Sequence, residues 1–503
     1  MVLEKLEPKN VWHIFEEVFT KTPRPSKKEE KIRRRLKEWI GKKEEELGIA
    51  FDVNEDEAGN ILIKKQADPD MEDVPSVILQ GHLDMVCETD RKGGFDFENK
   101  PIPVRIQKNG EWIDADETTL GADNGIGMAL GLAILTDPDI KHGPLEMLAT
   151  VDEETGLTGA FALDPEKMGI DSKLLINLDS EDVGVITIGS AGGGDTVLEK
   201  KIQKFEPKID DLFLKLSVSG LQGGHSGVDI HEPRANANKL VARCLSVLID
   251  TIEVRLSSWN GGGKRNAIPR ESHAVFAIRK EKADEARSLI EDEISAITEY
   301  YSRQSAKGDV LEPEITISLE NANPASTFNT ESSVCAIRTI HSLPHGPLRF
   351  SPSVVDLVET SNNVAVISTD EHGIELQMSS RSSIEEELES VRRRLVFIGK
   401  MGSWVGTRSP AYPGWAPNPQ SPFLQFIREK YEKVYGSDVI VEAIHAGLEC
   451  GILGAGIPGL QMVSIGPTIK NPHSPDEKLK IEDVGILYDV LKSVLADIGN
   501  MES

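Results

Sequence analysis

Residues 77–84 have the sequence VILQGHLD, and this stretch decides the predicted fold. Its apolar start is typical of a strand that is buried on both faces of a sheet. The strand runs into His82 and Asp84, and because alternate residues of a strand share a face, these two side chains should point the same way. Asp84 can then hold the His82 imidazole in one orientation, as carboxylates do for metal-ligating histidines.

Two further apolar runs in the first part of the chain also end on carboxylates. The run 145–151 is followed by Asp152-Glu153-Glu154, and the run 174–178 is followed by Asp179-Ser-Glu181. An apolar helix is expected at 126–135, before the second of the three strands. Strands that alternate with helices predict an α/β sheet with buried strands.

The polar side chains at the strand ends should converge into one site. Ligand sites of open α/β sheets lie outside the carboxyl ends of the strands. Asp123, at the start of the apolar helix, and His473, in a loop after an expected strand at 460–465, follow the same logic. Imidazoles and carboxylates suit Zn²⁺, with Mn²⁺ or Co²⁺ as alternatives, and two ions roughly 3.5–4 Å apart need a bridging carboxylate. The adjacent Glu153 and Glu154 cannot both point easily at one ion, so one can ligate while the other handles a proton.

The middle of the chain has a different pattern between two unusual stretches. Gly189-Ser-Ala-Gly-Gly-Gly194 marks the first boundary, and Ser409 to Pro422, whose five prolines forbid regular structure, marks the second. Between them we expect strands at 212–218, 272–279 and 364–378 and helices at 235–252, 282–302 and 384–395. Beyond them, a helix at 424–435 and strands at 439–441 and 460–465 restore the first pattern. The prediction is one α/β domain, 1–190 and 401–503, interrupted by an inserted α+β domain at 191–400.

The charge of the chain excludes one class of function. Of its 503 residues, 83 are Asp or Glu and 56 are Lys or Arg, which gives a formal charge of −27. Phosphate binding needs a cationic surface, so we exclude a nucleic-acid binder. The four cysteines form no C-x-x-C pair. No stretch of 18 consecutive apolar residues occurs, and the N-terminus lacks the pattern of a signal peptide. These features predict a soluble, cytoplasmic protein without membrane association.

Six motifs, taken in sequence order, resemble one family of enzymes. They are Gly81-His82-Leu-Asp84-Met-Val86, Gly121-Ala-Asp123-Asn-Gly125, Asp152-Glu153-Glu154-Thr-Gly156, Asn177-Leu-Asp179-Ser-Glu181, Gly223-Gly-His225-Ser-Gly227 and Asn471-Pro-His473-Ser. Together they resemble the di-zinc metallopeptidase family of carboxypeptidase G, aminoacylase and carnosinase, over nearly the whole chain. Further stretches resemble one group within it, the bacterial aminoacyl-histidine dipeptidases, also called cytosolic non-specific dipeptidases. These stretches are Gly227-Val-Asp-Ile-His231, Arg234-Ala-Asn-Ala-Asn238, Tyr412-Pro-Gly-Trp415 and His445-Ala-Gly-Leu-Glu-Cys-Gly451.

The resemblance implies a fold and a role for each candidate residue. The fold is a phosphorylase/hydrolase-like mixed-sheet catalytic domain, and the inserted α+β domain is its lid. The implied metal ligands are His82 and Asp179 for one ion, Glu154 and His473 for the other, and Asp123 between the two. Glu153 is implied as the general base that takes a proton from a metal-bridging water, with Asp84 supporting His82. The implied substrate residues are His225 for the scissile carbonyl, Asn266 and Arg381 for holding the substrate, and Gly447 for its terminal carboxylate.

The implied activity is the hydrolysis of unblocked dipeptides, Xaa-His among them, with two divalent ions, zinc first and manganese or cobalt as alternatives. Two other functions stay open. One is a deacylase or carboxypeptidase of the same family that acts on N-acyl amino acids, and the other is a relative that binds metal without catalysis. Family members with a short lid commonly dimerise so that the lid histidine serves the partner. Because the insertion at 191–400 is long, we expect His225 to act within its own chain, in a monomer or a homodimer.

Overall fold

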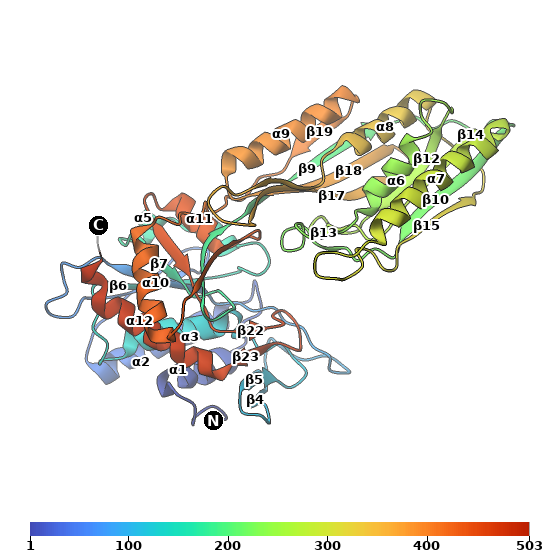
Figure 1. Cartoon of the computed structure of the whole chain (residues 1–503). Helices are drawn as coiled ribbons and strands as arrows, with labels where there is room; N and C mark the ends of the chain where they lie inside the picture. The colour runs from blue at the N-terminus through green and yellow to red at the C-terminus, as the bar shows by residue number, and fades with distance from the viewer. Residues whose placement is uncertain (502–503) are drawn as a thin grey trace. The chain divides into compact units, whose positions relative to one another are not determined.

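A computed structural model describes residues 1–501, which divide into two units. Unit 1 comprises Met1–Gly189, Pro417–Ala443 and the chain from Leu448 onward, and unit 2 comprises Ser190–Ala416 and Ile444–Gly447. The middle of the chain therefore builds unit 2 as an insertion into unit 1 (Figure 1). Strand β19 (Val405–Arg408) pairs with β9 (Gly192–Lys201), so unit 2 extends past residue 400, where the sequence analysis placed the end of the insertion.

Unit 1 contains an eight-stranded mixed sheet in the order β1-β2-β6-β3-β7-β21-β8-β20. The strands are β1 (Asp52–Glu55), β2 (Ile61–Lys65), β6 (Leu145–Thr150), β3 (Val77–His82), β7 (Leu174–Asn177), β21 (Gln461–Ser464), β8 (Val185–Ser190) and β20 (Ile440–Ile444). The four central strands, β6, β3, β7 and β21, are parallel, so their carboxyl ends meet at one edge. Every residue of β3, β6 and β7 is buried, which explains why their sequences are largely apolar.

Helices pack against this sheet and share one hydrophobic core with it (Figure 1). They are α1 (Lys9–Ile14), the π-helix η1 (Phe15–Thr20), α2 (Glu30–Leu47), α3 (Ala122–Thr136), α10 (Pro422–Tyr435), α12 (Ile481–Asp497) and the 3-10 helix η3 (Ile498–Asn500). Unit 1 also contains the short helices α4 (Thr158–Ala162), α5 (Pro165–Met168) and α11 (Glu449–Gly456). A small sheet joins β4 (Val104–Ile106), β5 (Trp112–Ala115), β23 (Lys478–Lys480) and β22 (Ile469–Lys470), and the β22–β23 loop contains His473. Of the helices within residues 1–501, none has both the length and the apolar character that crossing a bilayer requires.

Unit 2 contains a nine-stranded sheet whose neighbouring strands pair antiparallel. The order is β15 (Thr316–Asn321), β10 (Asp211–Ser219), β14 (Ser272–Arg279), β12 (Arg255–Gly261), β17 (Val358–Thr369), β18 (Gly373–Ser382), β9 and β19, with β16 (Gly346–Phe350) against β17. Its helices are η2 (Lys280–Lys282), α6 (Ala237–Ser246), α7 (Ala283–Tyr301), α8 (Thr330–Ser342) and α9 (Glu385–Met401), and β11 (Gly224–His225) pairs with β13 (Ala267–Ile268). Helices α6, α8 and α9 pack on the sheet around a second core (Figure 1). The two units confirm the predicted α/β and α+β fold classes.

The strand predicted at 364–378 is wrong, because this segment is the hairpin of β17 and β18. The chain reverses between Asp370 and Gly373, where the Asp370 carboxylate accepts N–H groups of His372 at 2.7 Å and Gly373 at 2.9 Å. Gly373 has φ +155°, and a Cβ there would lie 2.0 Å from the Lys200 carbonyl oxygen. A turn of this kind interrupts the apolar alternation too briefly for the pattern to show it.

Candidate metal centre and substrate residues

Strand order brings the predicted metal ligands of unit 1 to one place. His82 is the last residue of β3, and the segments with Glu154 and Asp179 follow the parallel neighbours β6 and β7. Asp123 lies in the first turn of α3, where its ψ of 113° departs from helical geometry. His473 comes from the loop between β22 and β23. All five predicted ligands therefore meet beyond the carboxyl ends of the central strands.

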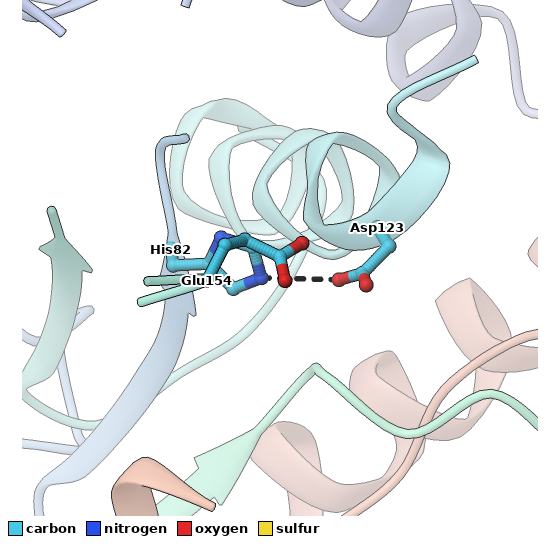
Figure 2. Close-up of side chains that lie close together, drawn as sticks. All are labelled: His82, Asp123 and Glu154. Atoms are coloured by element: carbon cyan, nitrogen blue, oxygen red, sulfur yellow. Dashed lines mark hydrogen bonds and ion pairs between the residues drawn. The ribbon is translucent and has the colours of Figure 1, made fainter. Parts of the chain in front are cut away.

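Asp123 lies between the two histidines. Its Oδ1 is 3.0 Å from Nε2 of His82, and its Oδ2 is 2.9 Å from Nε2 of His473. The same His82 nitrogen is 3.3 Å from Oδ1 of Asp179, and the His473 nitrogen is 3.0 Å from Oε2 of Glu154. Figure 2 shows His82, Asp123 and Glu154 directed at a common point. Each histidine thus faces one carboxylate of its own and shares Asp123 with the other.

The donor set fits divalent cations. His82, Asp123 and Glu154 each offer one ligand atom, and these atoms all lie within 4.8 Å of one another. Among residues 1–501, Oε1 of Glu154 and Oδ1 of Asp179 are buried without a hydrogen bond. The single hydrogen on Nε2 of His82 bonds to Asp123 and cannot also bond to Asp179, so the Asp179 oxygen has no hydrogen-bond donor. Buried carboxylate oxygens without donors are costly unless a cation neutralises them, so the residues present suit a metal centre.

Asp84 supports the centre from the other side of the His82 ring. Its Oδ1 lies 3.3 Å from Nδ1 of His82 and accepts the N–H of Glu153 at 3.0 Å. Its Oδ2 accepts the N–H of Glu154 at 3.3 Å. Burial works to raise the pKa of Asp84, but the hydrogen bond and charge of His82 outweigh it and lower that pKa to about 2. Asp84 therefore stays ionised and joins the end of β3 to the loop after β6.

Burial and crowded charge shift the pKa values of the remaining groups. Burial raises the pKa of Asp179 to about 7, and burial with the nearby Asp179, Glu449 and Glu154 carboxylates raises the pKa of Glu153 well above its usual range. Hydrogen bonds to Asp123 and Glu154 raise the pKa of His473 to about 11. The protein groups alone thus hold protons that bound cations would displace.

A buried polar network beneath the centre was missed by the sequence analysis. Asn177 donates to Oε1 of Gln80 at 2.6 Å, and Gln80 donates to Oε2 of Glu449 at 2.7 Å. Thr150 donates to the same Glu449 oxygen at 2.7 Å. Gln80 and Asn177 each stand two residues before a predicted ligand on neighbouring strands. A polar residue inside each otherwise apolar run was the signal that could have revealed this network.

The predicted substrate residues all lie in unit 2. Nδ1 of His225 accepts the N–H groups of Gly227 at 3.2 Å and Val228 at 3.1 Å, so the ring hydrogen of neutral His225 must sit on Nε2. Burial and the charge of Arg381 lower the pKa of His225, which favours this neutral form. His225 of β11 pairs antiparallel with Ala267 of β13, the residue that follows Asn266. Both His225 and Asn266 line a cavity of about 870 Å³ within unit 2.

Arg381 and Gly447 meet around Tyr412. Arg381, on β18, is buried and donates from Nη1 to the Tyr412 hydroxyl at 2.9 Å. A Cβ at Gly447 would lie 3.2 Å from Cε2 of Tyr412, and one at Gly227 would lie 3.1 Å from the His225 ring and 3.2 Å from Nε of Arg381. Gly227 therefore lies against both His225 and Arg381, and Tyr412 lies against both Arg381 and Gly447. Asn266 is exposed and adjoins Ala267, the strand partner of His225.

Comparison with known proteins decides the family. The family described as peptidase family M20/M25/M40 matches residues 78–497, which is more than half of the chain. The chain belongs to this family. The M20-family chain is 38% identical over 499 residues, 99% of each protein, to the cytosol non-specific dipeptidase of Escherichia coli (strain K12). The family inferred from the six motifs is confirmed, and with it the prediction of a peptidase.

Solved structures agree with this assignment. The crystal structure of aminoacylhistidine dipeptidase from Vibrio alginolyticus matches with a TM-score of 0.89 and 38% identity, covering 98% of this chain and 97% of that one. A tripeptidase from Staphylococcus aureus matches with a TM-score of 0.54 and 16% identity, covering 98% and 99% of the two chains, which shows the shared fold alone.

Proposed function

We propose that this M20-family chain is a metal-dependent dipeptidase that hydrolyses unblocked dipeptides, Xaa-His among them. The placement of Asp123 between His82 and His473 carries the proposal, because it is the arrangement that a bridging ligand of two cations requires. Full-length similarity to proteins named non-specific dipeptidase and aminoacylhistidine dipeptidase supports the substrate class.

Two divalent cations fit the donor set, zinc first and manganese or cobalt as alternatives. His82 and Asp179 would hold one ion, Glu154 and His473 the other, and Asp123 both. Such cations supply Lewis acidity at a carbonyl oxygen and make water nucleophilic near neutral pH. Asp84 keeps the His82 ring oriented for this role.

Glu153 is assigned the proton transfers. Its side chain is half-buried beside Glu154, and burial with the neighbouring carboxylates raises its pKa, so this group can hold a proton between taking it from water and passing it on. In the hydrolysis, Glu153 removes one proton from the attacking water and delivers one to the departing amine. Water supplies one oxygen of the new carboxyl group, and the peptide C–N bond breaks. The second water proton leaves the carboxyl group for the product amine, which gives a carboxylate and an ammonium group.

The unit 2 residues are assigned to the substrate. The Nε2–H of neutral His225 can donate to a carbonyl oxygen that gains negative charge. Arg381 has a planar fork that matches a terminal carboxylate, and Gly447 lies against Tyr412, the hydrogen-bond partner of Arg381. Asn266 directly precedes β13. A small peptide substrate follows from this set. We also propose a cytoplasmic location, which the cytosolic relative and the absence of disulfides among residues 1–501 support, and a monomer or homodimer with His225 acting in its own chain.

An assay of dialysed protein tests the proposal. Zinc, manganese and cobalt are restored in turn, and hydrolysis of Ala-His is compared with that of N-acetyl-Ala-His. The proposal expects cleavage of the free dipeptide alone. Cleavage of the acetylated compound alone would assign a deacylase or carboxypeptidase instead, and cleavage of neither with full metal binding would assign a non-catalytic relative.

A further inference from the structure

A buried carboxylate outside the predicted site contacts the segment that carries Asp123. Glu477 lies in the β22–β23 loop, four residues after His473, and is 2% exposed. Its Oε2 accepts the backbone N–H groups of Leu120 at 2.7 Å and Gly121 at 2.8 Å. Its Oε1 accepts those of Ala122 at 2.8 Å and Asp123 at 3.2 Å. One side chain therefore satisfies four consecutive backbone donors.

These four bonds fix the position of Asp123. Backbone N–H groups at a helix start have no partner inside the helix, and an anion there is favoured by the helix dipole. Glu477 supplies that anion without touching the Asp123 carboxylate, which stays directed at His82 and His473. Because Glu477 and His473 belong to one loop, the bonds also set the distance of that loop from α3.

Arg24 holds the same segment from its carbonyl side. Arg24 is 1% exposed and donates from Nη1 to the carbonyl oxygens of Leu83 at 3.0 Å and Asp84 at 2.6 Å. Its Nη2 donates to the Gly121 carbonyl. A Cβ at Gly121, whose φ is +69°, would lie 2.6 Å from that nitrogen, so the residue must be glycine. Arg24 thereby ties the chain after His82 to the start of α3.

We propose that Glu477 is a positioning residue of the metal centre, acting together with Arg24. Glu477 connects the His473 loop to the Asp123 backbone, and Arg24 connects that backbone to the end of the His82 strand. The three metal-ligating segments are thus held in register by two oppositely charged, buried side chains. This inference rests on the proposed metal centre, and it predicts that Glu477 sets metal affinity while leaving the substrate contacts unchanged.

Isothermal titration calorimetry, with zinc added to metal-depleted protein, tests the inference. In E477Q the amide NH₂ group faces two of the N–H donors, so Asp123 should lose its position. We expect at least one zinc ion to bind roughly 10–100-fold more weakly, as for other partners that orient metal ligands. Peptidase activity should recover when zinc is raised, with an unchanged KM for the dipeptide.

The matched control is E146Q. Glu146 is a buried carboxylate of unit 1 that accepts the N–H groups of Asp171 at 3.2 Å and Ser172 at 3.4 Å, at the start of β6 and away from the centre. E146Q should lose stability but bind zinc like the parent. If E477Q binds zinc like the parent, the inference is overturned while the proposed function stands. A parent that binds none of zinc, manganese and cobalt would overturn the proposed function instead.

A second variant decides the matter if E477Q does not fold. E477D keeps the carboxylate but has a side chain one methylene shorter, so its circular dichroism spectrum should match that of the parent. Its hydrogen bonds to the segment 120–123 should be weakened, so zinc should bind E477D more weakly than the parent. Zinc affinity equal to that of the parent in folded E477D would overturn the inference.

Discussion

Nε2 of His473 lies 2.9 Å from Oδ2 of Asp123, although 350 positions separate the two residues in the chain. The other Asp123 oxygen faces His82 at 3.0 Å, so one carboxylate connects a strand end, a helix start and a distant loop. This relationship is the geometric basis for assigning two cation sites with one shared ligand.

The adjacent residues Glu153 and Glu154 should respond differently to the same change. E153Q removes the group proposed to exchange protons, so kcat should fall by about 10²–10⁴-fold while two zinc ions still bind. E154Q removes a proposed ligand carboxylate and should lose zinc. Metal content by atomic absorption and kcat measured on the same samples separate the two roles. Loss of zinc in E153Q with retention in E154Q would reverse the assignment.

Arg381 should act on substrate binding. R381K keeps the charge but loses the fork, so the KM for a free dipeptide should rise by about 10–100-fold, the value of one charge-assisted hydrogen bond. The exposed Arg349 on β16 of the same unit provides the control R349K, which should leave KM unchanged. An unchanged KM in R381K would remove Arg381 from the substrate site.

The buried His445 should make unit 2 less stable in acid. Burial and the charge of Arg381 lower the pKa of His445 to about 3, and its Nε2 lies 2.7 Å from the Ser361 hydroxyl. An unfolded histidine titrates near pH 6.5, so as the pH falls below about 6.5 the unfolded chain binds the proton and the folded chain does not. The stabilisation is therefore present above that pH and is lost as the pH falls toward 3, by at most about 1.4 kcal/mol per pH unit.

Urea unfolding at pH 7 and pH 5 measures this effect. H445Q should reduce the difference in unfolding free energy between the two pH values. H372Q, which changes an exposed histidine of the β17–β18 turn, should not. An identical pH dependence in H445Q and the parent would show that His445 does not contribute.

The strand ends could be predicted from the sequence because buried parallel strands leave continuous apolar runs and then expose their polar side chains at one edge. His82, Asp179 and Glu154 follow directly from that rule. Glu477 could not be predicted in the same way, because its partners are backbone N–H groups, which carry no side-chain signal. The turn at Asp370 could not be predicted either, because the alternation of apolar residues continues on both sides of it.

The most direct test of a metal-dependent dipeptidase is the hydrolysis of Ala-His by chelator-treated protein as zinc is returned in measured equivalents. If two ions share Asp123 as a ligand, the chelated protein should be inactive, and activity should reach its maximum when two equivalents of zinc are bound. Full activity in the chelated protein, or no activity at two bound equivalents of any of the three metals, would contradict the account.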